Sequence, residues 1–171
     1  MYRVMLRSVL ALLVAASAVP AAAQAKVAVI DVQRVVTESD PGKEALQKLK
    51  ELSDRKVQEG QGIQQELAEL REQFNKQRFT LSEDKLEAMT KDIEDRQIAL
   101  QRFEDDAQRE LNEARRRALG ALEQRIMPVI DAVGQEKGLT LIFNKFQSGL
   151  VYADDTVDIT DEVIRRFNTI Q

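Results

Sequence analysis

The sequence contains no cysteine, no histidine and no tryptophan, and its 171 residues include only 3 prolines and 7 glycines. Without cysteine the chain has no disulfide framework, no thiolate nucleophile and no site for lipoprotein acylation. Without histidine it lacks the general base that usually works near neutral pH and the commonest metal ligand. The sequence pI near 5.1 argues against a nucleic-acid partner, because that binding needs an excess of lysine and arginine facing phosphates.

Sequence motifs for catalysis, metals and cofactors are also missing. The acidic pairs Asp105-Asp106 and Asp154-Asp155 lack the Asp-x-Asp-x-Asp-Gly pattern of a calcium loop. No glycine-rich phosphate loop follows a strand-like run, and no Gly-x-Ser-x-Gly elbow occurs. The triplet Arg115-Arg116-Arg117 would suit an anionic partner, but a solvated helix face is the favoured interpretation. We therefore predict no catalytic residue, no metal site and no cofactor, and we do not expect an enzyme.

The first residues have the pattern of a secretory signal peptide. Arg3 and Arg7 precede an uncharged, mostly apolar run over residues 8–19, and Ala23-Gln24-Ala25 is a small-x-small cleavage pattern. The alternative is a membrane anchor, but the apolar run falls short of the ~20 residues that span a bilayer. We therefore predict a signal peptide over residues 1–25, cleaved after Ala25 or Ala23, and an exported protein.

Two long helices are predicted over residues 43–133, after a turn at Asp40-Pro41-Gly42. Charged residues make up 32% of the chain and aromatic residues 5%, which is typical of a coiled coil. At 1.5 Å per residue the helices would run roughly 55 Å and 75 Å, too long for a globule of this size. Ser82 is a suitable N-cap for the second helix. We therefore expect an antiparallel hairpin that projects as an arm, with its tip near residues 79–82.

Apolar spacing and charge spacing both support these helices. In the first helix the apolar residues follow an alternating spacing of three and four, interrupted by polar residues and glycine. The members of this seam are Leu46, Leu49, Ile63, Leu67, Leu70, Phe74 and Leu81. Acid-before-base pairs four residues apart, such as Glu44/Lys48, Glu72/Lys76 and Asp92/Arg96, each contribute ~0.2–0.5 kcal/mol.

The remaining residues, 26–42 and 134–171, are predicted to form a small β-rich head. Short strands are expected at 26–31, 139–143 and 150–152, the last two joined as a hairpin, with a final helix at 161–169. The fold class is therefore α+β, predominantly α.

A head of this size buries little on its own and exposes strand edges, so we predict an oligomer held through the head. The residues expected at the subunit interface are Val27, Val29, Leu141, Ile142, Phe143 and Val151.

Two features of the arm are candidates for function. Basic and aromatic residues gather near the tip, which suits contact with a client protein or a membrane: Arg71, Phe74, Lys76, Arg78, Phe79 and Leu81. The alternative is that Phe74 and Leu81 belong to the helix seam and that the bases are solvated. Gly60 and Gly62 lie within the first helix, where each costs up to ~1 kcal/mol relative to alanine. They are either a hinge that widens a cavity or points of close packing against the second helix.

Four segments of the head closely resemble the Skp/OmpH family of periplasmic chaperones: residues 26–36, 138–143, 149–152 and 157–168. The resemblance implies a homotrimer with a β-rich body and three helical hairpins around a cavity. It also implies a periplasmic, ATP-independent holdase that keeps unfolded outer-membrane β-barrel proteins soluble and passes them to outer-membrane assembly. Physically this is reasonable, because an unfolded barrel exposes alternating apolar residues that would aggregate.

The charge of this chain departs from the family, whose members are often strongly basic. Residues 43–127 carry 19 acids and 17 bases, and residues 26–42 together with 128–171 carry 10 acids and 6 bases. We therefore do not expect the overall charge to attract acidic partners, and we do not assign to this chain the lipopolysaccharide site of basic family members. Any transient contact with an anionic membrane surface must depend on local charges. The second hypothesis is a structural or docking protein of the cell envelope that uses rigid hairpins. The interrupted seam and the mid-arm glycines suit a flexible cage better.

Overall fold

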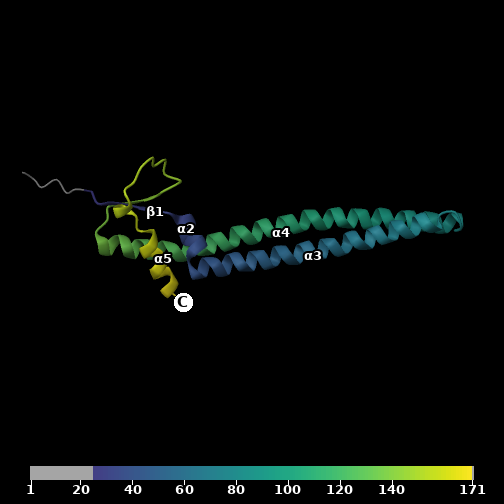
Figure 1. The fold of residues 1–171 in the computed structure, drawn as a ribbon, viewed down its shortest axis with the longest axis horizontal. Helices are drawn as coiled ribbons and strands as arrows, with labels where there is room; N and C mark the ends of the chain where they lie inside the picture. The colour runs from purple at the N-terminus through teal and green to yellow at the C-terminus, as the bar shows by residue number, and fades with distance from the viewer. Residues whose placement is uncertain (1–24, 171) are drawn as a thin grey trace, which may run out of the picture.

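A computed structural model describes residues 25–170, and the predicted signal peptide falls outside that range except for Ala25. A long helical hairpin projects from a small head (Figure 1). The elements in chain order are β1 (Val27–Ile30), α2 (Val32–Glu38), α3 (Asp40–Gln77), α4 (Glu83–Lys137), β2 (Leu141–Asn144), the 3₁₀ turn η1 (Asp155–Val157) and α5 (Thr160–Thr169). The predicted fold class, a helical arm with a small β-containing part, is confirmed.

Local signals explain where the arm helices begin and end. Helix α3 begins at Asp40 rather than at residue 43, because the Ser39 hydroxyl caps it by accepting from the Gly42 amide at 3.2 Å and Pro41 fits its first turn. The expected turn at residues 40–42 is therefore helical. A side chain at position 42 would run into the Val36 carbonyl, which explains the glycine there. Helix α4 ends at Lys137 and is capped by Gly138, whose backbone adopts the left-handed region with φ 62°.

Helices α3 and α4 run antiparallel and pack side by side along the arm (Figure 1). The predicted pairs Glu44–Lys48 and Glu72–Lys76 form within α3, at 2.6 Å and 2.5 Å. Arg96 pairs instead across the hairpin, with Glu66 of α3 at 2.6 Å. A second bridge, Lys56 to Glu110 at 3.0 Å, also joins the two helices. Ion pairs between the helices therefore supplement the interrupted apolar seam.

The head contains a two-stranded parallel sheet in which β1 pairs with β2, Val27 opposite Leu141 and Ile30 opposite Asn144. On its other side β1 receives the Ile159 amide, which donates to the Val29 carbonyl at 2.9 Å. Within residues 25–170 no strand pairs with the second edge of β2.

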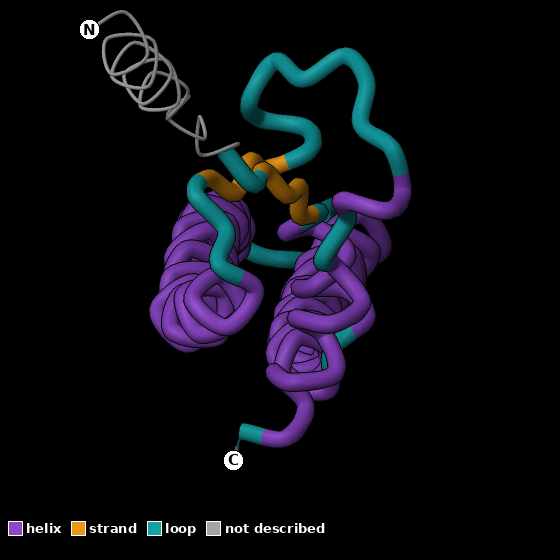
Figure 2. The backbone as a smooth tube through the Cα atoms, turned by 90° about the vertical axis from the view of Figure 1, so that its left-hand side faces the viewer, coloured by secondary structure: helices purple, strands orange, loops and turns teal. Residues whose placement is uncertain are grey.

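The prediction of a third strand at residues 150–152 is wrong for the single chain. These residues lie in a loop between β2 and η1 that stands away from the helices (Figure 2). Val151 is 100% exposed and Tyr152 79%, so nothing among residues 25–170 covers a strand placed there. A strand that buries no apolar face gains little from pairing.

The core of the head lies between the sheet, α2, α5 and the last turns of α4. Its buried members are Ala28, Ile30, Val35, Leu122, Ile126, Val129, Ile130, Val133, Ile159, Val163 and Phe167. Helix α4 thus contributes to the head from Leu122 onward, well before residue 134. The long helix connects arm and head without a linker, so the arm is anchored in the hydrophobic core.

Candidate functional site

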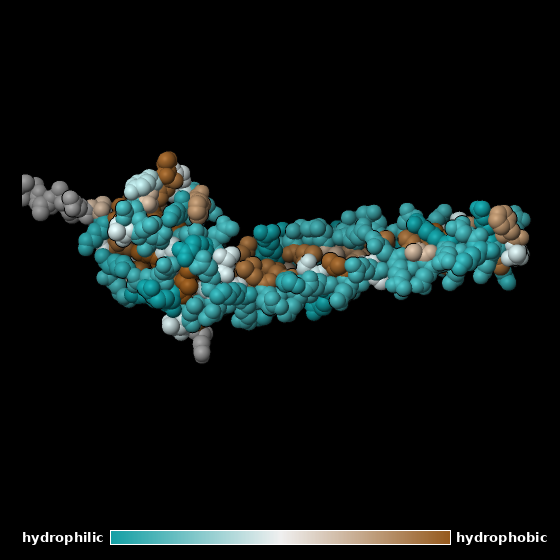
Figure 3. Space-filling view, in the orientation of Figure 1, coloured by the Kyte–Doolittle hydropathy of each residue, from teal (hydrophilic) through white to brown (hydrophobic). Residues whose placement is uncertain are grey.

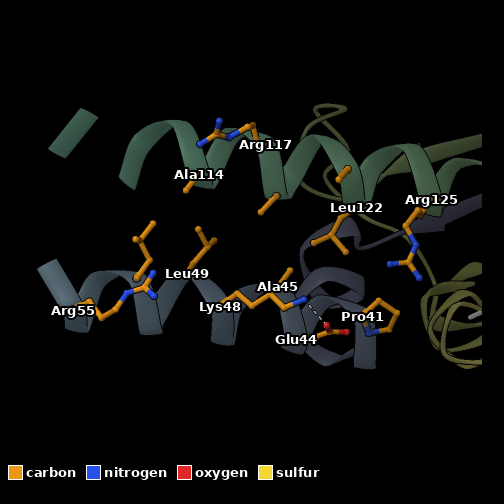
Figure 4. A pocket seen from close by; sticks show the side chains of 13 residues that line it. Pro41, Glu44, Ala45, Lys48, Leu49, Arg55, Ala114, Arg117, Leu122 and Arg125 are labelled. Atoms are coloured by element: carbon orange, nitrogen blue, oxygen red, sulfur yellow. Dashed lines mark hydrogen bonds and ion pairs between the residues drawn. The ribbon is translucent and has the colours of Figure 1, made fainter. Parts of the chain in front are cut away.

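A groove between α3 and α4 lies where the arm joins the head, and it was not predicted from the sequence. Its volume is about 450 Å³. Figure 4 shows the side chains that line it. Its floor is formed by small or apolar residues of both helices: Ala45, Leu49, Leu52, Ala114, Ala118, Ala121 and Leu122. Alanine side chains cannot reach across to the facing helix, so the seam stays open here. Apolar surface is visible between the helices next to the head (Figure 3).

Four basic residues surround this groove, Lys48 and Arg55 from α3 and Arg117 and Arg125 from α4, with Glu44 as the single carboxylate. Lys48 is paired with Glu44 at 2.6 Å, and its hydrogen bond, together with its charge, lowers the pKa of the Glu44 carboxyl below the ordinary value. Among residues 25–170, Arg55 and Arg117 have no ion-pair partner. The groove is therefore an apolar trough with a cationic rim.

Arg125 is held toward the head. Its Nη2 donates to the Ile170 carbonyl at 3.4 Å, and its guanidinium lies 5.5 Å from the centre of the Phe167 ring. The other bases of the rim are further out along the arm. The sequence signal that could have revealed this groove is the set of alanines at three- and four-residue spacing in α4. Arg117 belongs to the triplet 115–117, which we interpreted as a solvated helix face.

The tip residues predicted from the sequence do not form one cluster. Phe79 is 82% exposed, with the Arg78 guanidinium 4.6 Å from the centre of its ring. Lys76 is paired with Glu72, and Arg71 donates to the Gln97 side chain at 2.8 Å. Phe74 is half-buried in α3, as a member of the helix seam would be, and Leu81 is half-buried in the turn between α3 and α4. Only Arg78 and Phe79 are thus presented to solvent together.

The two mid-arm glycines differ in their surroundings. A Cβ on Gly60 would lie 3.1 Å from Cε1 of Phe103, whereas a Cβ on Gly62 would meet nothing within 4 Å. Gly60 therefore fits the close-packing interpretation, with Phe103 of α4 as its neighbour. Gly62 has no packing reason among the described residues.

The outer face of the sheet carries part of the predicted subunit interface. In the parallel register Val27, Leu141 and Phe143 share one face, and they are 39%, 50% and 38% exposed. The neighbouring loop adds exposed apolar side chains at Phe146, Leu150, Val151 and Tyr152.

Val29 and Ile142 differ from the other predicted interface residues. Val29 is only 2% exposed, and Ile142 packs against the core of its own chain. Val29 is therefore covered within its own subunit, and Ile142 lies against the core with only part of its side chain exposed. Their replacement by aspartate is therefore expected to destabilise the fold of the head itself, before any effect on contacts between subunits.

The comparison with protein families gives a match to the model described as outer membrane protein (OmpH-like), over residues 26–167. The chain belongs to the OmpH-like family. A candidate outer membrane chaperone (OmpH-like) from Caulobacter crescentus CB15, of known crystal structure, shares the fold with a TM-score of 0.78. It is 23% identical in sequence, and the match covers 85% of each chain. No curated protein sequence matches this one.

Within the described part of this OmpH-like chain, no group of three or more acidic residues is arranged to hold a metal ion. Over the same residues, no helix has an apolar stretch sufficient to cross a membrane. Three surfaces described above are candidates for binding: the groove, the tip and the outer face of the sheet.

Proposed function

We propose that this OmpH-like protein is a periplasmic holdase chaperone. It works without ATP, as a trimer, and keeps unfolded outer-membrane β-barrel proteins soluble until outer-membrane assembly receives them. The observation that carries the proposal is a long hairpin arm, hydrophilic outside and open along its seam, that grows from a head with an uncovered apolar face. The family match and the chaperone name of the Caulobacter crescentus CB15 neighbour support the same role.

The trimer is proposed because of the outer face of the head. Val27, Leu141 and Phe143 together with the loop at 145–154 leave apolar side chains in solvent beside the free edge of β2. In a trimer, neighbouring subunits would cover this face and pair with that edge. Three arms would then extend from one body and enclose a space for the client.

The holding step requires weak, distributed contacts. An unfolded barrel presents alternating apolar residues, which aggregate when they meet those of another chain. Arms with scattered apolar contacts and a charged exterior separate such chains and still release them, since no single contact is strong. No bound nucleotide is needed for this cycle. The exposed Arg78 and Phe79 at the tip are the residues that we propose for transient contact with an anionic membrane surface.

The second candidate is a structural or docking protein of the envelope. The contact of Gly60 with Phe103 and the cross-helix pairs Lys56–Glu110 and Arg96–Glu66 favour it, because they stiffen the arm. A stiff rod would dock one folded partner and would not enclose unfolded ones.

Light scattering after size exclusion separates the two. The exported protein is measured alone and after rapid dilution of a urea-unfolded outer-membrane barrel into it, without nucleotide. The holdase predicts a trimer that becomes a soluble trimer-plus-client complex. An oligomer that leaves the barrel to precipitate would contradict the holdase and favour the docking rod.

A further inference from the structure

We propose that the groove at the base of the arm is a subsite for acidic client segments, in which an apolar side chain has carboxylates nearby on both sides. The inference rests on the proposed function and names the chemistry of the client that this part of the arm selects. The groove offers an apolar floor to the side chain and arginine to the carboxylates.

The charge of the groove is opposite to that of the protein. The whole chain has a formal net charge of −4, whereas the groove is lined by four bases and one acid. Lys48 already neutralises Glu44, so the charge left for a ligand comes from the arginines. At physiological ionic strength fields are screened over about 8 Å, so a segment in the groove responds to these near charges and not to the distant net charge.

Arg55 and Arg117 are the two arginines that we assign to the ligand. They stand on facing helices, and neither has an ion-pair partner within residues 25–170. Arginine forms two parallel hydrogen bonds with a carboxylate, so each is suited to one acidic side chain. Arg125 is engaged with Ile170 and Phe167, which leaves it a positioning role at the head end of the groove.

The shape of the groove favours a peptide. Its volume of about 450 Å³ lies in the range of small-ligand sites, and it follows the seam between two antiparallel helices. In an extended chain, side chains two residues apart point to the same side about 7 Å from one another. The order acid-x-apolar-x-acid therefore directs one apolar side chain to the alanine floor while both carboxylates remain at the rim. A holdase with a net negative charge can bind acidic stretches of a client in such a groove, because attraction to the nearby arginines outweighs the long-range repulsion from the rest of the protein.

The absence of tryptophan from the protein permits a direct assay. The probe is a short end-capped peptide of sequence Asp-Ser-Trp-Ser-Asp, and the control peptide has Asn in place of each Asp. Titration of the exported protein is followed by tryptophan emission, which shifts to shorter wavelength on burial. The acidic peptide is expected to bind roughly five- to tenfold tighter than the control peptide, because two exposed ion pairs contribute a difference in binding free energy of that size. High salt should remove the difference in affinity.

The test variant is R55Q with R117Q, and the matched control is R115Q with R116Q. Both doubles remove two positive charges, and glutamine preserves helix propensity. Arg115 and Arg116 are exposed neighbours of Arg117 that do not line the groove. The groove variant should lose the preference for the acidic peptide, whereas the control should keep it within about twofold, as expected for surface charges away from the ligand. Equal losses in both variants would overturn the proposal, and so would equal binding of the two peptides by the unaltered protein.

Two further readouts complete the design. Phosphatidylglycerol vesicles are titrated in parallel, because groove-dependent vesicle binding without peptide discrimination would assign the groove to lipid and overturn the peptide proposal. Solubility of a urea-unfolded barrel is measured with the same proteins. A protein that holds barrels but does not discriminate the peptides refutes only this inference. A protein that discriminates the peptides but lets barrels precipitate refutes the holdase and leaves the groove as an acidic-peptide site.

Discussion

The ring of Phe103 in α4 lies directly against Gly60 in α3, so that a Cβ on Gly60 would come to 3.1 Å from Cε1 of that ring. The ammonium group of Lys56 lies 5.8 Å from the centre of the same ring. One glycine of the arm is therefore a contact point between helices, while Gly62, two residues further on, faces open space.

This difference predicts that one alanine substitution stabilises the arm more than the other. Gly62→Ala should stabilise the arm by up to ~1 kcal/mol, because alanine has the higher helix propensity and meets no neighbour. In thermal unfolding this corresponds to an increase in Tm of about 2–4 °C. Gly60→Ala should increase the free energy of unfolding by less than half as much, because the Phe103 ring must shift to make room for the Cβ. Equal gains would show that the ring contact does not constrain the helices.

The hinge hypothesis makes a separate prediction for the same positions. If Gly60 and Gly62 let the cavity widen, the double substitution should reduce the size of the largest unfolded barrel that stays soluble. The measurement is light scattering with a series of barrels of increasing strand number. Unchanged capacity for the largest barrel would remove the hinge role and leave Gly60 as a packing residue.

Two aspartate substitutions in the head should separate folding from assembly. Val29→Asp buries a carboxylate at a position that is 2% exposed, and we expect it to unfold the head. Leu141→Asp, at a position 50% exposed on the outer face, should leave the subunit folded and weaken the trimer. Circular dichroism reports the first effect and molar mass by light scattering the second. A folded Val29→Asp protein, or a Leu141→Asp protein of unchanged mass, would contradict these placements.

The hydroxyl of Thr160 joins three parts of the head. It accepts from the Asp31 amide at 2.8 Å, it donates to the Asp158 carboxylate, and the residue is fully buried. Thr160→Val preserves the shape but leaves the Asp31 amide without its partner, at a cost of about 1–3 kcal/mol. Denaturant unfolding should show this loss. Thr37→Val, at an exposed helix position, is the matched control and should change stability by less than about 0.5 kcal/mol.

Asp158 should make the head sensitive to acid. Burial raises the pKa of its carboxyl, but hydrogen bonds from Thr160 and Lys145 outweigh burial and hold the pKa below the ordinary value of 3.8. A carboxyl with a lowered folded pKa stabilises the fold above its unfolded pKa, and that stability is lost as pH falls through the folded value. Stability of the head should therefore be constant above about pH 5 and decline below pH 4.

Asp158→Asn tests the origin of this decline. The variant should be less stable near neutral pH and should lose less stability on acidification, because its amide does not titrate. The measurement is the denaturant midpoint as a function of pH. An acid decline as steep as that of the unaltered protein would assign the effect to other carboxyls, such as Glu136 and Glu162, whose pKa values are lowered by bonds from Arg166 and Lys137 respectively.

The arm could be predicted from the sequence because its determinants are local. Apolar spacing and charge pairs such as Glu44–Lys48 act within one or two helical turns, and the segments are long enough for the pattern to be clear. The turn at residues 40–42 was misassigned because Pro41 and Gly42 also suit the first turn of a capped helix. At the tip, the same periodicity correctly places Phe74 in the seam, whereas Leu81 lies in the turn beyond the end of α3 at Gln77.

The sequence alone determined a charged helical hairpin, a head with too little buried surface to be stable alone, and the absence of a histidine or cysteine site. The tertiary structure decided that β1 pairs in parallel with β2, although more than a hundred residues separate Val27 from Leu141. It also decided that residues 150–152 stay unpaired, and that alanines of α4 face Ala45 and Leu49 to leave a basic-rimmed groove. Pairing and cavities depend on which faces meet across the fold, and that relation is set by packing between distant segments, not by any pattern within one of them.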